Sequence, residues 1–87
     1  MLSFEFDPDK SIVNEQKHGI NFADAQALWQ DERLIEVPAR VVDEERFLVV
    51  GSIGSAVWSA IITYRGEVIR IISVRRARPE EVEIYEG

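Results

Sequence analysis

Two groups of residues in this sequence have the types and spacing that chemistry requires. The first is the step Lys17-His18-Gly19, where the only histidine of the chain stands beside a second basic residue. An imidazole titrates near neutral pH, so His18 could act as a general acid or base while Lys17 stabilises an anion. The alternative is that both side chains only complement the negative end of a helix that the glycine closes. Spacing alone favours this second interpretation.

The second group is a run of arginines. Between Arg65 and Arg78 the chain carries five arginines and one acid, a net charge of +4 within a chain of −6. The planar guanidinium suits bidentate contacts with phosphates and carboxylates, which is typical of a surface that binds a polyanion. The alternative is that these arginines pair with acids elsewhere in the chain. The members of the group are Arg65, Arg70, Arg75, Arg76 and Arg78.

Several other residues allow two interpretations. Arg46 directly follows three acids, so an ion pair with them and an active-site role are equally open. Asp7-Pro8-Asp9 has the composition of a carboxylate pair, but capping of the following helix explains it better. Aromatic residues are expected in the core rather than as platforms for nucleic-acid bases. They are Phe22, Trp29, Phe47 and Trp58.

The composition excludes several classes of protein. A chain of 87 residues and 10.0 kDa, 46% apolar and 30% charged, predicts one small folded domain over residues 1–87. The lack of cysteine excludes disulfides, Fe–S clusters and thiol nucleophiles, and one histidine cannot build an ordinary zinc site. No apolar run reaches the roughly 18 residues of a membrane span, and the first residues lack the basic start of a signal peptide. We therefore expect a cytoplasmic protein without metal, cofactor or membrane contact.

Local signals predict the elements that must position these residues. Alternation of apolar and polar residues over 2–6 predicts a short strand. Pro8 and Gly19 bound a first helix, and Asn21 caps a second one. Strands are then expected at 34–37, 46–52, 56–64 and 67–75, with a loop at 41–45 and a last short helix at 80–86.

This order, β-α-α-β-β-β-β-α, predicts an α+β fold of two layers. Hairpin connections imply a small antiparallel sheet packed on one face against the N-terminal helices, with a short C-terminal helix. Strict alternation divides the residues of the last strand between the two sides of the sheet. One side would carry Ile69, Ile71, Ser73 and Arg75, and the other Val68, Arg70, Ile72, Val74 and Arg76.

The ordered motifs resemble the BrnT family, the toxins of BrnT–BrnA type II toxin–antitoxin modules. The likeness spans nearly the whole chain. Its most specific parts are Asn-x-x-Lys-His-Gly from Asn14, Glu-Arg-Phe from Glu45 and Arg-Ile-Ile-Ser-x-Arg from Arg70. The further matches are Phe6-Asp7, Lys10, Phe22, Ala25, Asp31, Gly51, Arg65-Gly66, Arg75-Arg76-Ala77, Glu81 and Tyr85.

The resemblance implies a RelE-like fold and a metal-independent ribonuclease that cleaves RNA and inhibits translation. It also implies neutralisation by a BrnA-like ribbon-helix-helix antitoxin in a hetero-oligomer, with DNA contacted only through the antitoxin. In such a site His18 is the acid or base and Lys17 contacts the phosphate. The other residues assigned to catalysis are Arg65, Arg75, Arg46 and Tyr85, and those assigned to RNA binding are Arg70, Arg76, Arg78 and Tyr64.

Two features set the chain apart from the pattern of the family. Arg78 stands where threonine usually caps the final helix, and a net charge of −6 repels RNA from the body of the molecule. The alternative function is therefore a noncatalytic interaction domain, a silenced toxin whose arginine patch binds an acidic partner. In that case His18 only completes a helix end.

Overall fold

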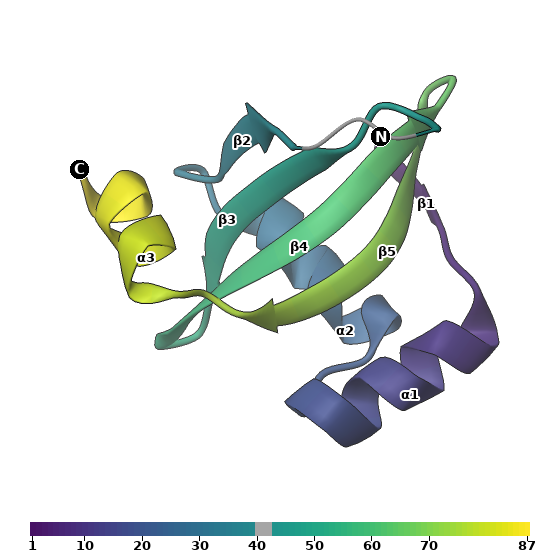
Figure 1. Ribbon diagram of the computed structural model, residues 1–87, viewed down its shortest axis with the longest axis horizontal. Helices are drawn as coiled ribbons and strands as arrows, with labels where there is room; N and C mark the ends of the chain where they lie inside the picture. Colours follow the sequence, from purple (N-terminus) through teal and green to yellow (C-terminus); the bar gives the residue numbers. More distant parts are fainter. Residues whose placement is uncertain (40–42) are drawn as a thin grey trace.

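The computed structural model describes residues 1–39 and 43–87 of the chain. Within them the expected order of elements is confirmed (Figure 1). Of the loop expected at 41–45, residues 41 and 42 lie outside the described residues, and 43–45 form no helix or strand. The helices are α1 (Pro8–His18), α2 (Phe22–Ala25), the 3₁₀ helix η1 (Gln26–Gln30) that continues α2, and α3 (Pro79–Glu86). The strands are β1 (Ser3–Glu5), β2 (Ile35–Pro38), β3 (Phe47–Ile53), β4 (Ala56–Arg65) and β5 (Val68–Arg76).

The five strands form one sheet in the order β1-β5-β4-β3-β2. Strands β2 to β5 are an antiparallel meander, as the hairpin signals predict. Strand β1 instead runs parallel to β5, with Phe4 opposite Ile69, so the sheet as a whole is mixed. The first strand is not joined to its neighbour by a hairpin, and the geometry of the turns therefore does not impose an antiparallel pairing on it.

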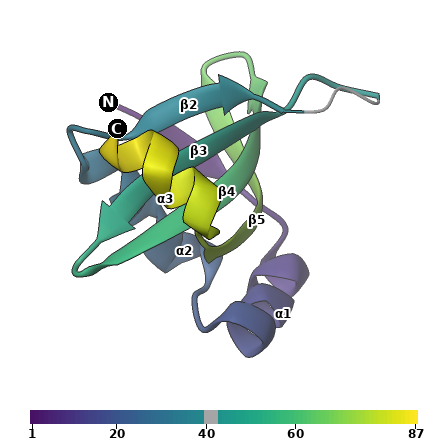
Figure 2. The same ribbon diagram turned by 60° about the vertical axis from the view of Figure 1, so that its left-hand side comes forward.

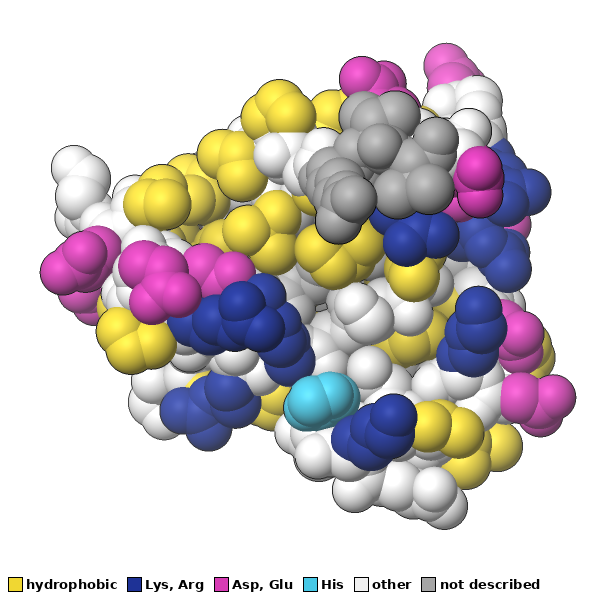
Figure 3. All heavy atoms as spheres, viewed as in Figure 1, with side chains coloured by type: hydrophobic (Ala, Val, Ile, Leu, Met, Phe, Trp, Pro, Cys, Tyr) yellow, Lys and Arg dark blue, Asp and Glu magenta, His cyan; other side chains and the backbone are white. Residues whose placement is uncertain are grey.

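The helices occupy both sides of the sheet. Helix α2 and η1 cover one side, which we call the helix face, whereas α3 lies against the opposite side (Figures 1 and 2). We call this opposite side the far face; it carries Leu48, Val50, Ser59 and Ile61. Figure 3 views the far face and shows hydrophobic side chains gathered over β2, β3 and β4. The expected α+β fold is confirmed, with α2 and η1 packed on one face of the sheet and the short C-terminal helix α3 on the other.

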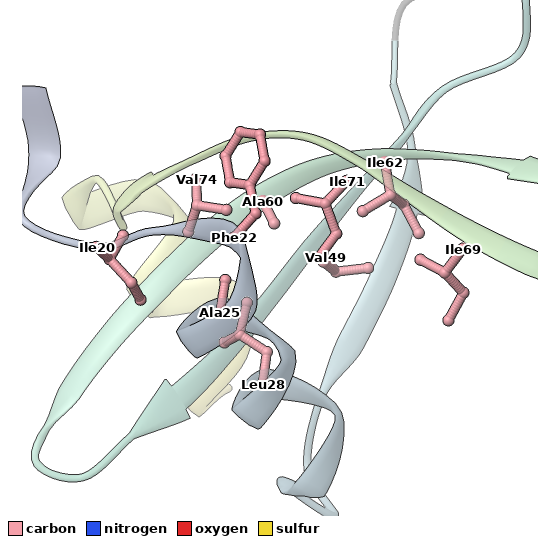
Figure 4. Packing of buried hydrophobic residues seen from close by; sticks show 10 residues of the cluster. All are labelled: Ile20, Phe22, Ala25, Leu28, Val49, Ala60, Ile62, Ile69, Ile71 and Val74. Atoms are coloured by element: carbon pink, nitrogen blue, oxygen red, sulfur yellow. The ribbon is translucent and has the colours of Figure 1, made fainter. Parts of the chain in front are cut away.

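The core lies between the helix face and α2 with η1 (Figure 4). Phe22 and Leu28 are fully buried there, and the partly buried rings of Trp29, Phe47 and Trp58 pack against the cluster. The core position expected for these aromatic residues is confirmed. The buried members of the cluster are Ile20, Phe22, Ala25, Leu28, Val49, Ala60, Ile62, Ile69, Ile71 and Val74.

Candidate functional site

The caps of α1 fix where its basic end lies. Asp7 accepts a hydrogen bond from the Asp9 N–H (2.9 Å), and Pro8 occupies the first turn, as the sequence predicts. Gly19 ends the helix in the left-handed conformation, at φ 79°, and its N–H donates to the Glu15 carbonyl. The last turn therefore carries Lys17-His18, with both side chains exposed at the negative end of the helix dipole.

Asn14, one turn before Lys17 and His18, fastens α1 to the edge of β5. Its buried amide donates to the carbonyls of Ile20 (2.8 Å) and Val74 (2.9 Å), and its carbonyl oxygen accepts from the Val74 N–H (3.1 Å). The N–H and carbonyl groups at the edge of β5 thus find their hydrogen-bond partner in a side chain from a helix. The last turn of α1 is consequently held beside the segment of β5 that contains Ser73.

A β-bulge shapes β5 at the same place. Ile61 of β4 pairs with Ser73, whereas the next residue, Ile62, pairs with Ile71. Ile72 is therefore an extra residue that has no partner in the register. A bulge re-aims the side chains that follow it, and bulges are common beside active sites.

The bulge makes the expected strict alternation in β5 wrong. Ile71 and Val74 both face the core, at 2% and 0% exposure, although three positions separate them. Ser73 and Arg75 instead share the far face with Arg70, since they pair with far-face residues of β4. Arg70, Ser73 and Arg75 thus lie on the side of the sheet away from the core, whereas Arg76, which pairs with Trp58, lies on the helix face.

A hollow of about 330 Å³ lies between α1 and the bulge of β5. This volume is at the lower end of the range typical of small-ligand sites. Figure 3 shows the histidine, coloured cyan, with the dark blue side chains of basic residues on both sides of it. The lining residues are Asp9, Lys10, Val13, Asn14, Lys17, His18, Phe22, Ile72 and Ser73. The hollow therefore combines an imidazole, two ammonium groups, one carboxylate, an amide and a hydroxyl with apolar walls.

Arg75 lies on the far face at the next outward position after Ser73, where Glu81 of α3 holds it. Its guanidinium donates to both carboxylate oxygens, with Nη1–Oε1 2.7 Å and Nη2–Oε2 2.8 Å. This contact is the main reason that the pKa of Glu81 falls to about 2, and it also raises the pKa of Arg75. The Arg75 side chain stays 27% exposed, so part of it can still face a ligand.

Two more arginines of the run pair with acids. Arg70 contacts Glu5 at 2.5 Å, and Arg65 lies 3.7 Å from Glu44 with its side chain 53% exposed. For these arginines and for Arg75 the pairing interpretation is confirmed. The charge of +4 that the sequence assigns to this stretch is therefore largely compensated, and the pair at Arg65 is the weakest because both side chains are exposed.

The other three arginines to which a functional role was assigned have different surroundings. Arg76 lies opposite Trp58 with its guanidinium carbon 5.4 Å from the ring centroid, a cation–π contact. Arg78 is the N-cap of α3, and its N–H donates to Glu81 (2.8 Å), which supplies the capping that its own side chain cannot. Arg46 is exposed, and no carboxylate in residues 1–39 and 43–87 lies within 4.0 Å of its charge.

Both tyrosines proposed for function donate to carboxylates. The Tyr85 hydroxyl donates to Asp31 (2.5 Å), and this bond is the main reason that the pKa of Asp31 falls to about 2. The Tyr64 hydroxyl, near the C-terminal end of β4, donates to Glu36 of β2. Desolvation together with that carboxylate raises the pKa of Tyr64 to about 12. The hollow is lined by neither of them.

A comparison with models of protein families matches residues 6–81 to the family described as "Ribonuclease toxin, BrnT, of type II toxin-antitoxin system". The chain belongs to the BrnT family. It is therefore a ribonuclease toxin of a type II toxin–antitoxin system, with RNA as substrate and an antitoxin as partner. No curated protein matches the chain. The matched range of this BrnT chain contains the whole hollow and the pair of Arg75 with Glu81, and it ends before Tyr85.

The candidate site includes residues that were assigned no catalytic or binding role from the sequence. Asn14, Ser73 and Glu81 were recognised only as parts of the family pattern. A local signal for Glu81 exists, because an acid three residues after an N-cap is typical of a capping box. Asn14 and Ser73 have no such signal, since their importance depends on a contact between α1 and β5.

In residues 1–39 and 43–87 no helix has the length and apolar composition needed to cross a membrane. No three histidine or carboxylate side chains of the described residues lie close enough together to share a metal ion.

Proposed function

We propose that this BrnT cleaves RNA at the hollow between α1 and β5, with His18 as the general acid or base. The observation that supports this proposal is the convergence of His18, Lys17 and Ser73 around one hollow open to solvent. Two of these residues end a helix near the start of the chain, and the third lies in the last strand. Asn14 and the bulge at Ile72 hold the two segments together.

The residues fit the chemistry of RNA cleavage. A base takes the proton of the 2′-hydroxyl, the resulting oxygen attacks the phosphorus, and an acid protonates the 5′-oxygen as its bond to phosphorus breaks. His18 performs one of these two proton transfers. The crowded phosphate carries extra negative charge in the transition state, and Lys17 stabilises that charge.

Arg75 is proposed as a second phosphate contact. Successive outward positions of a strand are about 7 Å apart, so its guanidinium lies within reach of a phosphate bound beside Ser73. The pair with Glu81 fixes its orientation and leaves its side chain 27% exposed. Arg46, Arg76 and Arg78 are exposed and are proposed as contacts to the rest of the RNA backbone. The hydroxyls of Tyr64 and Tyr85 donate to carboxylates, and the proposed chemistry does not use them.

In the cell, we propose that this cleavage inhibits translation in the cytoplasm without a metal ion. The proposed antitoxin is a BrnA-like ribbon-helix-helix protein that forms a hetero-oligomer with this chain and alone contacts DNA. The proposed fold class is RelE-like. The alternative function, an arginine patch that binds an acidic partner, loses support because Arg65 and Arg70 already lie within 4.0 Å of carboxylates of the chain.

The test measures RNA cleavage in EDTA by wild type and by His18→Ala, with Gln16→Ala as the matched control. Gln16 is exposed on the same turn of α1 and does not line the hollow. Since general acid–base catalysis contributes about 10²–10⁴-fold, we expect His18→Ala to lose at least about 100-fold in rate while Gln16→Ala keeps it. Circular dichroism establishes that all three are folded. Equal cleavage by wild type and His18→Ala would contradict the assignment, and loss of wild-type cleavage in EDTA would contradict metal independence.

A further inference from the structure

A row of aliphatic side chains crosses the far face of the sheet toward the hollow. Val37 on β2 pairs with Leu48 on β3, which in turn pairs with Ile61 on β4. Ile61 pairs with Ser73 on β5, which lines the hollow beside His18. Directly opposed residues point to the same side of a sheet, and all three aliphatic side chains are partly exposed. We call Val37, Leu48 and Ile61 the aliphatic row.

The residues on both sides of the aliphatic row are either covered or already hydrogen-bonded within the chain. On one side α3 covers Val50 and Ser59, which are each 1% exposed. On the other side the Thr63 hydroxyl donates to the Glu45 carbonyl (2.7 Å), and Arg70 is paired with a carboxylate of β1. What this part of the far face offers to a ligand is therefore mainly apolar surface.

The dimensions of the aliphatic row suit a segment of protein. Neighbouring strands are about 4.8 Å apart, so a row across three strands is about 10 Å long. An apolar stripe of an amphipathic helix, or two side chains of an extended strand, covers this length. Single exposed aliphatic residues need no explanation, whereas contiguous apolar surface beside a functional site is a feature of contact surfaces.

The charges around the aliphatic row favour a protein over RNA. The chain has a net charge of −6, and Arg75, the next outward residue after Ser73, is already paired with Glu81 of α3, so little free positive charge is left along the row for a polyanion. At the β5 end the hollow presents three basic groups, Lys10, Lys17 and His18, against one acid, Asp9. A carboxylate complements this excess of basic groups.

We propose that the aliphatic row is the docking surface for the antitoxin of this system. A segment of the antitoxin lays branched aliphatic side chains on Leu48 and Ile61 and ends with a carboxylate over Lys17 and His18. Neutralisation then follows because one continuous surface joins the row to the hollow, so the bound segment excludes the RNA phosphate. That last step rests on the proposed function; the docking itself does not.

The test measures how tightly the antitoxin, the purified product of the gene next to the one for this chain, binds this chain with substitutions in the aliphatic row. The substitutions are Leu48→Glu and Ile61→Glu. Their matched controls are Ile12→Glu and Ile84→Glu, at aliphatic residues that are 57% and 58% exposed on α1 and α3. We expect each row variant to bind at least about 100-fold more weakly than either control. Equal affinity of row variants and controls, or no binding by the chain with an unchanged row, would overturn the proposal.

A second measurement covers the case in which a glutamate in the sheet prevents folding. A photo-crosslinking amino acid at position 61 replaces the isoleucine with another apolar side chain, and we expect an adduct with the antitoxin. An adduct with RNA, or one between two copies of this chain, would overturn the proposal. Cleavage assays keep the two hypotheses apart, because unchanged cleavage by His18→Ala refutes the proposed chemistry without altering the binding result.

Discussion

The contact between Glu81 and Arg75 predicts a large loss of stability in the variant Glu81→Gln. The Glu81 carboxylate accepts from the Arg75 guanidinium, the Ser59 hydroxyl and the Arg78 N–H, and the residue is only 8% exposed. Glutamine keeps the shape and the acceptor oxygen but removes the charge. The guanidinium then stays partly buried without a counter-ion, which is the costly way to break an ion pair.

The pKa of Glu81 gives the magnitude. It falls from an ordinary value of 4.5 to about 2, mainly through the contact with Arg75. Because one pKa unit corresponds to 1.36 kcal/mol, this shift amounts to about 3 kcal/mol of folding free energy. Small domains have a total stability of about 5–15 kcal/mol. In a domain of this size such a loss lowers the melting temperature by roughly 10–25 °C.

The sign of the pH dependence is also fixed. A lowered folded-state pKa means that the contribution of Glu81 is complete above pH 4.5 and is lost as the pH falls through about 2. The difference in melting temperature between wild type and Glu81→Gln should therefore be large at pH 7 and shrink toward pH 2. Thermal denaturation followed by circular dichroism measures it, with Glu83→Gln, exposed on the same helix, as the control. If Glu81→Gln melts within 3 °C of Glu83→Gln at pH 7, the reasoning is refuted.

Three further outcomes follow from other contacts. Asn14→Ala leaves the N–H and carbonyl of Val74 without their partner. It should therefore lower the free energy of unfolding, measured with urea, by about 2 kcal/mol or more. A decrease below about 0.5 kcal/mol would argue against the link between α1 and β5. Tyr85→Phe removes the main cause of the low pKa of Asp31, so a carboxyl titration by NMR should show that pKa rising from about 2 toward 3.8, and an unchanged value would disprove the assignment. In Tyr85→Phe protein the remaining tyrosine, Tyr64, should ionise near pH 12 in an absorbance titration, whereas a midpoint near 10 would contradict the effect of its surroundings and of the Glu36 carboxylate.

Much of the site follows from signals within a few residues of chain. The Asp7 cap, Pro8 and Gly19 define α1 and so place Lys17-His18 at its exposed end. The turns at Gly54 and Gly66, both with positive φ, set the meander of β3, β4 and β5. Each of these features depends on the conformational preference of one residue or on a bond to a near neighbour. That is why an unaligned sequence predicted them.

The arginine run could not be interpreted in the same way. Its charge is plain in the sequence, but whether a guanidinium is available depends on acids far away in the chain, as with Arg70 and Glu5 across the pairing of β1 with β5. The bulge at Ile72 is a second example. A single extra residue in a strand leaves no mark in a pattern of alternating types, and yet it decides that Ser73 lies on the far face.

Residue types and short-range signals were enough to predict a small α+β protein of the BrnT type, with an imidazole and an ammonium group at the end of its first helix. Which groups surround this helix end depends on the assembled fold. The reason is physical, because caps and turns depend on bonds between near neighbours in the chain. The hollow instead depends on the hydrogen bond from Asn14 to Val74 and on the bulge of β5. The pairing of Arg75 depends on where α3 packs against the sheet. Those contacts exist only once the sheet has assembled.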